Sequence, residues 1–199
     1  MIETTLFRKI EDFATELLTS NAVCELCYHN VEHTKRVVQN VERIGKHEGV
    51  SEKDLDILRI IAWFHDLGYS VSYIEHEDAS IAITISFLRN EGMEEDFIDT
   101  IISGINATRV PQRPMTKLER IIADADLFDL GSDHYFEKSQ QLFDEWNKCL
   151  KPSNARSLWE LSLQFLKDHS YFTQYGIDIL APKKEKNMRE LEERLKLLP

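Results

Sequence analysis

The chain has 199 residues, 42% of them hydrophobic and 30% charged, which is ordinary for a globular protein. Its formal net charge of −11, from 35 acidic and 24 basic residues, argues against a nucleic-acid polymer as partner, because phosphate backbones are bound by clustered lysine and arginine. No apolar run approaches the roughly 18 residues of a membrane helix, and the N-terminus lacks a signal-peptide pattern, so we expect a cytoplasmic protein without a membrane partner.

Apolar residues recur at helical spacing along the chain, and no convincing two-residue alternation marks a strand. Ser51 and Thr116 are expected N-caps, and Gly68 is the expected stop of the helix that begins at Ser51. The first expected helix spans about residues 1–20. After a short break near Asn21, a second helix bears His29 and His33 and ends near Lys46. The others span about residues 51–66, 78–90, 94–105, 116–131, 136–146, 158–166 and 183–198. The sequence therefore predicts an all-α fold.

The chain is long enough for one domain with a helical appendage. We predict a domain over residues 1–150 and a C-terminal helical extension, residues 151–199, packed on it. The charged segment 183–198 suits either packing on the domain or pairing with a second subunit, so a homodimer stays open. Three cysteines predict no disulfide framework, and Cys24 and Cys27 are interpreted as two reduced thiols.

Imidazole and carboxylate groups occupy core positions of three expected helices. His29 and His33 are four residues apart and would project from one helix face. His65 and Asp66 end a nearly unbroken apolar run, and Asp126 continues the apolar stripe of a later helix. Ionised groups in apolar surroundings need partners, and one shared divalent cation would satisfy all of them. The pattern predicts a metal centre.

Three strings carry a family resemblance: YHNVEHTKRVV (residues 28–38), AWFHDLGY (62–69) and RIIADADLFDLG (120–131). Their order H…HD…D resembles the HD-domain superfamily of metal-dependent phosphohydrolases, over roughly residues 20–135. YHNVEHT (residues 28–34) and ADL (residues 125–127) also look like strings of class I cyclic-nucleotide phosphodiesterases. The rest of the chain does not look like a full phosphodiesterase catalytic domain, so that substrate does not transfer. The resemblance implies a single HD-domain helical bundle with extra C-terminal helices.

The resemblance also implies roles for individual residues. His33, His65, Asp66 and Asp126 would be the metal ligands, and His29 would be the general acid that protonates the leaving oxygen. Asp66 would also orient or deprotonate the attacking water, as a catalytic residue. The mixture of nitrogen and oxygen ligands suits Mn²⁺, Fe²⁺, Co²⁺ or Zn²⁺ and disfavours Ca²⁺.

Two-metal members of the superfamily carry further histidines between the HD pair and the last aspartate. Here His76 is the one candidate, because residues 77–125 contain no histidine. One divalent transition metal is therefore expected, with a second ion as the less favoured alternative, and the dinuclear iron oxygenases of this fold are disfavoured. His76 would then contact the substrate phosphate, together with Arg109 and Arg113 from a proline-containing loop.

Several assignments have structural alternatives. Asp124 competes with Asp126 as the ligand, and His29 could be a hydrogen-bonded structural histidine. His76 could be a plain loop residue, while Arg109 and Arg113 could be simple surface charges.

The expected activity is that of a metal-dependent phosphohydrolase acting on a small phosphorylated molecule, with nucleotides as the leading class. Phosphomonoester, cyclic phosphodiester and nucleoside-triphosphate cleavage are not separable from the sequence. The alternative is a non-catalytic metal- or nucleotide-binding regulatory protein of the same fold. The complete H…HD…D set together with His29 argues against that alternative, since a binding protein does not need every ligand and an acid.

Overall fold

The computed structural model describes residues 4–20, 26–150 and 155–197, and in these residues it contains helices and no strand. The all-α prediction is confirmed. The α-helices of the described residues are α1 (Thr4–Ser20), α2 (Val31–His47), α3 (Glu52–Phe64), α4 (His76–Asn90), α5 (Glu95–Asn106), α6 (Lys117–Asp126), α7 (Tyr135–Cys149), α8 (Ala155–Asp168) and α9 (Ala181–Leu197). Among these helices we find none with the length and apolar content of a membrane span.

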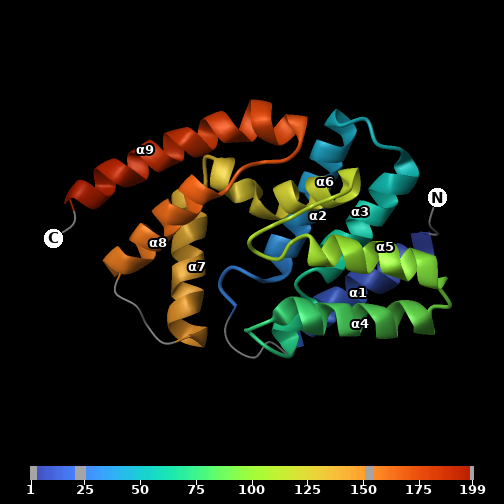
Figure 1. Cartoon of the computed structure of the whole chain (residues 1–199). Helices are drawn as coiled ribbons and strands as arrows, with labels where there is room; N and C mark the ends of the chain where they lie inside the picture. The colour runs from blue at the N-terminus through green and yellow to red at the C-terminus, as the bar shows by residue number, and fades with distance from the viewer. Residues whose placement is uncertain (1–3, 21–25, 151–154, 198–199) are drawn as a thin grey trace.

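Among the first six helices, α3 is central, and α1, α2, α4, α5 and α6 pack around it (Figure 1). Most of α3 is buried, from Leu55 to Phe64 with the exception of Arg59, because it contacts α1, α2, α5 and α6. A 3₁₀ helix, η1 (Leu67–Ser70), follows α3 and packs against α4. The almost continuous apolar run seen in the sequence is thus the central helix of the main hydrophobic core, and its C-terminal end carries His65 and Asp66.

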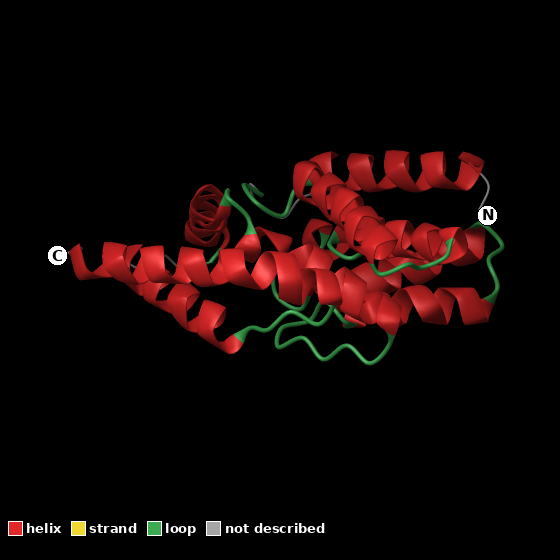
Figure 2. Cartoon of the chain, turned by 90° about the horizontal axis from the view of Figure 1, so that it is seen from above, coloured by secondary structure: helices red, strands yellow, loops and turns green. Residues whose placement is uncertain are grey.

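A second hydrophobic cluster joins α7, α8 and α9. Its buried members are Tyr135, Leu166, Leu191 and Leu195. These helices lie to one side of α1–α6, and α9 projects away from them (Figures 1 and 2). A 3₁₀ helix, η2 (Leu127–Gly131), connects the clusters, since its Phe128 packs against the first and its Leu130 against the second. A π-helical turn, η3 (Gly176–Leu180), contacts η2 and α9. The second cluster already includes α7, which lies before residue 150. The predicted division into residues 1–150 and 151–199 stays a prediction.

Helix caps explain most element boundaries. Ser51 and Thr116 are the N-caps of α3 and α6, as predicted, and Thr116 forms a capping box with Glu119. The start of α2 was predicted wrongly. Asn30 is the N-cap and accepts hydrogen bonds from the backbone N–H groups of Glu32 and His33, so His29 lies outside the helix that carries His33.

The cysteine prediction is corrected in part. Cys24 lies outside the described residues, and Cys27 is not disulfide-bonded; its Sγ accepts a hydrogen bond from Lys148 Nζ at 3.3 Å. Cys149, the last residue of α7, is disulfide-bonded, so the expectation of no disulfide is wrong. Such pairing depends on tertiary proximity, which cysteine spacing in a single sequence does not reveal.

Gly68 is required by close packing rather than as a helix stop. It lies within η1, where a Cβ atom would overlap the backbone carbonyl of His76 and come within 2.7 Å of the Ser80 nitrogen. We expect Gly68→Ala to lower the free energy of unfolding by about 3 kcal/mol, since η1 and α4 would have to separate. Urea denaturation measures this loss.

Gly49→Ala is the matched control for Gly68→Ala. Gly49 has a φ of +67°, and a Cβ atom added there would meet no other atom within 4 Å, so only backbone strain of about 1 kcal/mol is expected. Equal losses in the two variants would show that the contact between η1 and α4 is not the constraint at Gly68.

Candidate metal centre

Three helix ends bring the predicted ligands together. His33 lies in the first turn of α2, His65 caps the C-terminus of α3 and is followed by Asp66, and Asp126 is the last residue of α6. His33, His65 and Asp66 are at most 4% exposed, and the Asp126 side chain is 16% exposed. Polar groups from four positions of the chain thus meet in the protein interior.

The spacing of their atoms suits a shared cation. The Asp66 Oδ2 atom lies 3.4 Å from Nε2 of His33 and 3.1 Å from Nε2 of His65. The Asp126 Oδ1 atom lies 3.3 Å and 3.4 Å from the same two nitrogens. Ligand atoms about 2.1 Å from one ion, at tetrahedral or octahedral angles, lie roughly 3.0–3.4 Å apart. The observed separations fall in or near that range.

The hydrogen bonding of these groups also indicates a cation. Both ring nitrogens of His33, Nε2 of His65 and Oδ2 of Asp66 are buried and make no hydrogen bond with the described part of the chain. His65 Nδ1 lies 2.8 Å from the carbonyl oxygen of Ala62, which can only accept, so Nδ1 carries the proton and Nε2 presents a lone pair. Buried polar atoms without partners are rare. The donor set therefore fits a divalent ion.

Electrostatics agree with this interpretation. Burial opposes ionisation of Asp66, but the imidazoles of His65 and His76 outweigh it and hold the pKa of the carboxyl well below its usual range. Burial also opposes ionisation of Asp126, yet the imidazoles of His33 and His65 lower its pKa to about 2. Burial lowers the pKa of His33, which favours the neutral imidazole that ligates metals. Burial would also lower the pKa of His65, but the two carboxylates raise it well above its ordinary value, so they favour a positive charge at Nε2, which is either a proton or, in its place, a cation.

His29 lies just before α2 and is held by Glu145 of α7. Its Nδ1 is 2.5 Å from Glu145 Oε1, while Oε2 accepts hydrogen bonds from the backbone N–H groups of Tyr28 and His29 at 2.7 Å and 3.0 Å. The Tyr73 hydroxyl donates to Oε1 at 2.8 Å. Because an ionised carboxylate can only accept a hydrogen bond, Nδ1 of His29 carries a proton. Nε2 is then the ring nitrogen that is available for proton transfer.

Glu145 was missed in the sequence analysis. It is fully buried, and 116 residues separate it from His29. A buried glutamate within an amphipathic helix is the one signal that could have pointed to it, because buried carboxylates need partners. Burial lowers the pKa of His29, but the hydrogen bond to Glu145 and the nearby carboxylates outweigh burial and raise that pKa above its ordinary value.

His76 lies beside the predicted ligands. Its Nε2 is 3.4 Å from Oδ1 of Asp66, whereas His33 and His65 lie beside the other oxygen, Oδ2. Tyr69 stacks against both His29 and His76, with ring centroids 4.4 Å and 3.9 Å apart. The structure thus places two further imidazoles, from different segments, at the edge of the site.

The predicted phosphate-binding arginines lie further out. Arg109 pairs with Asp78 and lies 3.6 Å from Glu77, and its Nε donates to the Asn106 side chain at 3.0 Å. Arg113 is exposed. Neither arginine lines the cavity at the metal centre, and their contact with phosphate stays a prediction.

Asp124 and Asp126 have different surroundings in the structure. Asp124 is fully buried and accepts hydrogen bonds from the backbone N–H groups of Phe172 and Thr173 and from the Thr173 hydroxyl. Its carboxylate is therefore engaged with the segment after α8, while Asp126 faces His33 and His65.

A cavity of about 530 Å³ opens beside the cluster. His29, Asp66, His76 and Asp126 form its polar end, and side chains of α7 and α8 line much of the remainder. Volumes of this size are typical of small-molecule sites.

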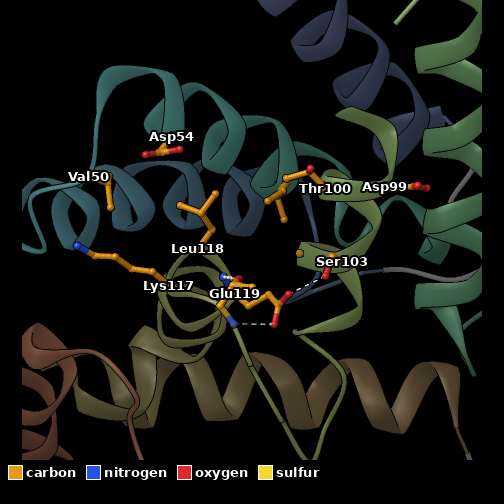
Figure 3. A pocket seen from close by; sticks show the side chains of 11 residues that line it. Val50, Asp54, Asp99, Thr100, Ser103, Lys117, Leu118 and Glu119 are labelled. Atoms are coloured by element: carbon orange, nitrogen blue, oxygen red, sulfur yellow. Dashed lines mark hydrogen bonds between the residues drawn. The ribbon is translucent and has the colours of Figure 1, made fainter. Parts of the chain in front are cut away.

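A separate cavity of about 550 Å³ lies between α3, α5 and α6 (Figure 3). Its buried acid, Glu119, accepts hydrogen bonds from Ser103 and from the backbone N–H groups of Met115 and Thr116, and Lys117 donates to the Glu48 carbonyl. These two charged groups are engaged with the protein itself, so neither of them points to a ligand.

Comparison with known proteins agrees with the geometry. The family model of the HD domain matches residues 30–131. The chain belongs to the HD-domain family. The matched region of this HD-domain protein runs from the cap of α2 to the end of η2, so it includes His33, His65, Asp66 and Asp126 and ends before α7.

Several solved structures resemble this HD-domain protein. A protein from Lactobacillus plantarum aligns over 100% of both chains, with 15% identity and a TM-score of 0.71. Bacillus subtilis YpgQ, solved in complex with ADP, covers 100% of this chain and 98% of its own, with 18% identity and a TM-score of 0.70. A protein named a predicted HD superfamily hydrolase, from an uncultured Thermotogales bacterium, covers 84% of this chain and 97% of its own, with 16% identity and a TM-score of 0.57. At such identities the likeness concerns the fold. No match was found among curated proteins.

Proposed function

We propose that this HD-domain protein is a metal-dependent phosphohydrolase that cleaves a phosphate ester or anhydride of a small molecule. The observation that carries the proposal is the set of His33, His65, Asp66 and Asp126, whose facing atoms lie 3.1–3.4 Å apart. In this set, His33 Nε2, His65 Nε2 and Asp66 Oδ2 are buried and make no hydrogen bond within the described part of the chain. Mixed nitrogen and oxygen donors suit Mn²⁺, Fe²⁺, Co²⁺ or Zn²⁺. Nucleotides are the leading substrate class, and the ADP bound to the YpgQ structure supports that choice.

The two oxygens of Asp66 allow two tasks. Oδ2 faces the imidazoles of His33 and His65, as a ligand would, while Oδ1 faces His76. A divalent ion bound there would lower the pKa of a water molecule from about 15.7 to about 7 and polarise a phosphoryl oxygen. The second oxygen of Asp66 would orient the attacking water, and His76 would contact the phosphate.

His29 would donate a proton to the leaving oxygen. The Glu145 carboxylate fixes the ring through Nδ1, and His29 itself lines the cavity. With Nδ1 occupied, Nε2 is the atom that can exchange a proton with the substrate. This arrangement supports an enzyme over a binding protein, because binding alone does not require an oriented proton donor.

Metal analysis combined with a turnover assay tests the proposal. Purified protein incubated with Mn²⁺ and then desalted should retain one ion per chain and hydrolyse p-nitrophenyl phosphate. Retention of the ion without turnover of p-nitrophenyl phosphate, a nucleoside monophosphate, a cyclic nucleotide or a nucleoside triphosphate would favour a regulatory metal-binding protein instead.

Glu145→Gln tests the positioning of His29. An amide keeps the size of the side chain but loses the charge that fixes the ring, so we expect kcat to fall by about 10²-fold with little change in KM or metal content. Glu137→Gln, at an exposed position of the same helix, should leave all three quantities unchanged. In a His29→Ala background, Glu145→Gln should cost no further activity. A full additional loss there would mean that Glu145 acts independently of His29.

A further inference from the structure

The cavity beside the metal centre is built by two different parts of the chain. Its polar end belongs to the region that the HD domain family matches, residues 30–131, or lies just before it. Its far wall comes from later residues: Leu142, Phe143 and Trp146 of α7, and Leu161 and Phe165 of α8. These positions recur three and four residues apart, so each helix presents one apolar face to the cavity.

Two features of this wall separate it from ordinary packing. Leu161 is 59% exposed although it lies against the cavity, and Trp146 is only partly buried. Large apolar side chains that remain accessible around a concave space are typical of ligand sites. The indole and phenyl rings of Trp146 and Phe143 have centroids 5.8 Å apart, which leaves an aromatic surface suited to another ring.

The charges around the cavity limit how many phosphate groups it can hold. Within the described residues that line it, Lys138 is the one cationic lysine or arginine, and its ammonium group donates to Glu137 and Gln141. Arg36 and Arg109 lie nearby, but each is within 3.6 Å of an acidic lining residue, Asp129 and Glu77 respectively. A polyphosphate chain needs additional cations, and here they already have acidic partners.

We propose that the cavity selects a phosphate ester with a single phosphate group and a flat aromatic group, which packs on the face formed by α7 and α8. The inference rests on the proposed function for the position of the phosphate, which would lie at the metal centre, and it adds the substrate class. A nucleoside monophosphate or another aryl-bearing monophosphate fits this description. A nucleoside triphosphate does not.

Equilibrium binding tests the inference without requiring turnover. Isothermal titration of the Mn²⁺-loaded protein should show that 1-naphthyl phosphate binds at least about 10-fold more tightly than inorganic phosphate, because the ring adds apolar contact. With Mn²⁺ in excess, adenosine monophosphate should bind at least about 10-fold more tightly than adenosine triphosphate, which has the same base and more charge.

Variants of the wall locate the site of the ring. Trp146→Ala and Leu161→Asp should each remove most of the advantage of 1-naphthyl phosphate over inorganic phosphate, while leaving the affinity for inorganic phosphate unchanged. Leu150→Asp is the matched control, since Leu150 is 40% exposed at the end of α7 and does not line the cavity. It should bind all ligands as the natural protein does.

The outcomes separate this inference from the proposed function. Equal affinities for 1-naphthyl phosphate and inorganic phosphate, tighter binding of the triphosphate, or no binding of any phosphate would overturn the inference. Tight binding of 1-naphthyl phosphate that depends on Trp146, without hydrolysis of any phosphate ester, would keep the selective cavity and overturn the hydrolase proposal alone.

Discussion

His65→Ala and Asp66→Ala are each expected to abolish both metal retention and phosphatase activity. Each removes a donor whose atoms lie within 3.4 Å of the other predicted ligands, and alanine offers no replacement. Loss of an outer partner of a metal ligand typically costs 10–100-fold in affinity, so loss of a ligand should exceed ~100-fold. Elemental analysis after desalting and turnover of p-nitrophenyl phosphate measure the two effects.

The control for this experiment is His47→Ala. His47 is the last residue of α2, and its side chain is 45% exposed. The His47→Ala variant should therefore retain both the metal and the activity. Circular dichroism should show a helical fold in all variants, since a collapsed fold would also lose the ion. A folded His65→Ala variant that retains one ion per chain would contradict the assignment of His65 as a ligand.

His29→Ala is expected to lower turnover by about 10²–10⁴-fold while the protein keeps its metal ion. The ring is fixed by Glu145 and lies outside the set of facing donor atoms, so its removal should not change the coordination of the ion. The loss should be larger for phenyl phosphate than for p-nitrophenyl phosphate, because phenolate is the poorer leaving group and depends more on protonation.

Two results would contradict this role of His29. Loss of the ion from His29→Ala would make His29 a ligand rather than the acid. Equal slowing of the two aryl phosphates would indicate a structural histidine that only shapes the site. His134→Ala, at an exposed position before α7, should change neither the ion content nor the ratio of the two rates.

The helices were predictable because their signals are local. The capping groups of Ser51 and Thr116 and the apolar run of α3 are contained within a few residues, and the structure shows the helices that they predict. The start of α2 shows the limit of this approach. Four-residue spacing of His29 and His33 suggested one helix face, but Asn30 caps between them, and local capping competed successfully with periodicity.

The site was only partly predictable because some of its contacts join distant segments. Proximity of His33, His65 and Asp126 could be expected, since each ends or begins an apolar stripe in the core. The local sequence around Glu145 could indicate at most a buried glutamate in an amphipathic helix, and it could not identify the partner, which lies 116 residues earlier. The acids that pair with Arg109 are also remote, 31 residues earlier for Asp78, and they make this arginine less available than the sequence indicated.

The hydrogen bonds of Asp124 would couple occupancy of the proposed metal centre to the order of a remote segment. Asp124 stands two residues before Asp126 on α6, and it anchors backbone groups 48 and 49 residues further along. By thermodynamic reciprocity, an ion that stabilises the end of α6 would also protect residues 172–173 from local unfolding. Local unfolding of that segment would in turn lower the affinity for the ion. Protease resistance near the C-terminus would then report metal loading from a distance.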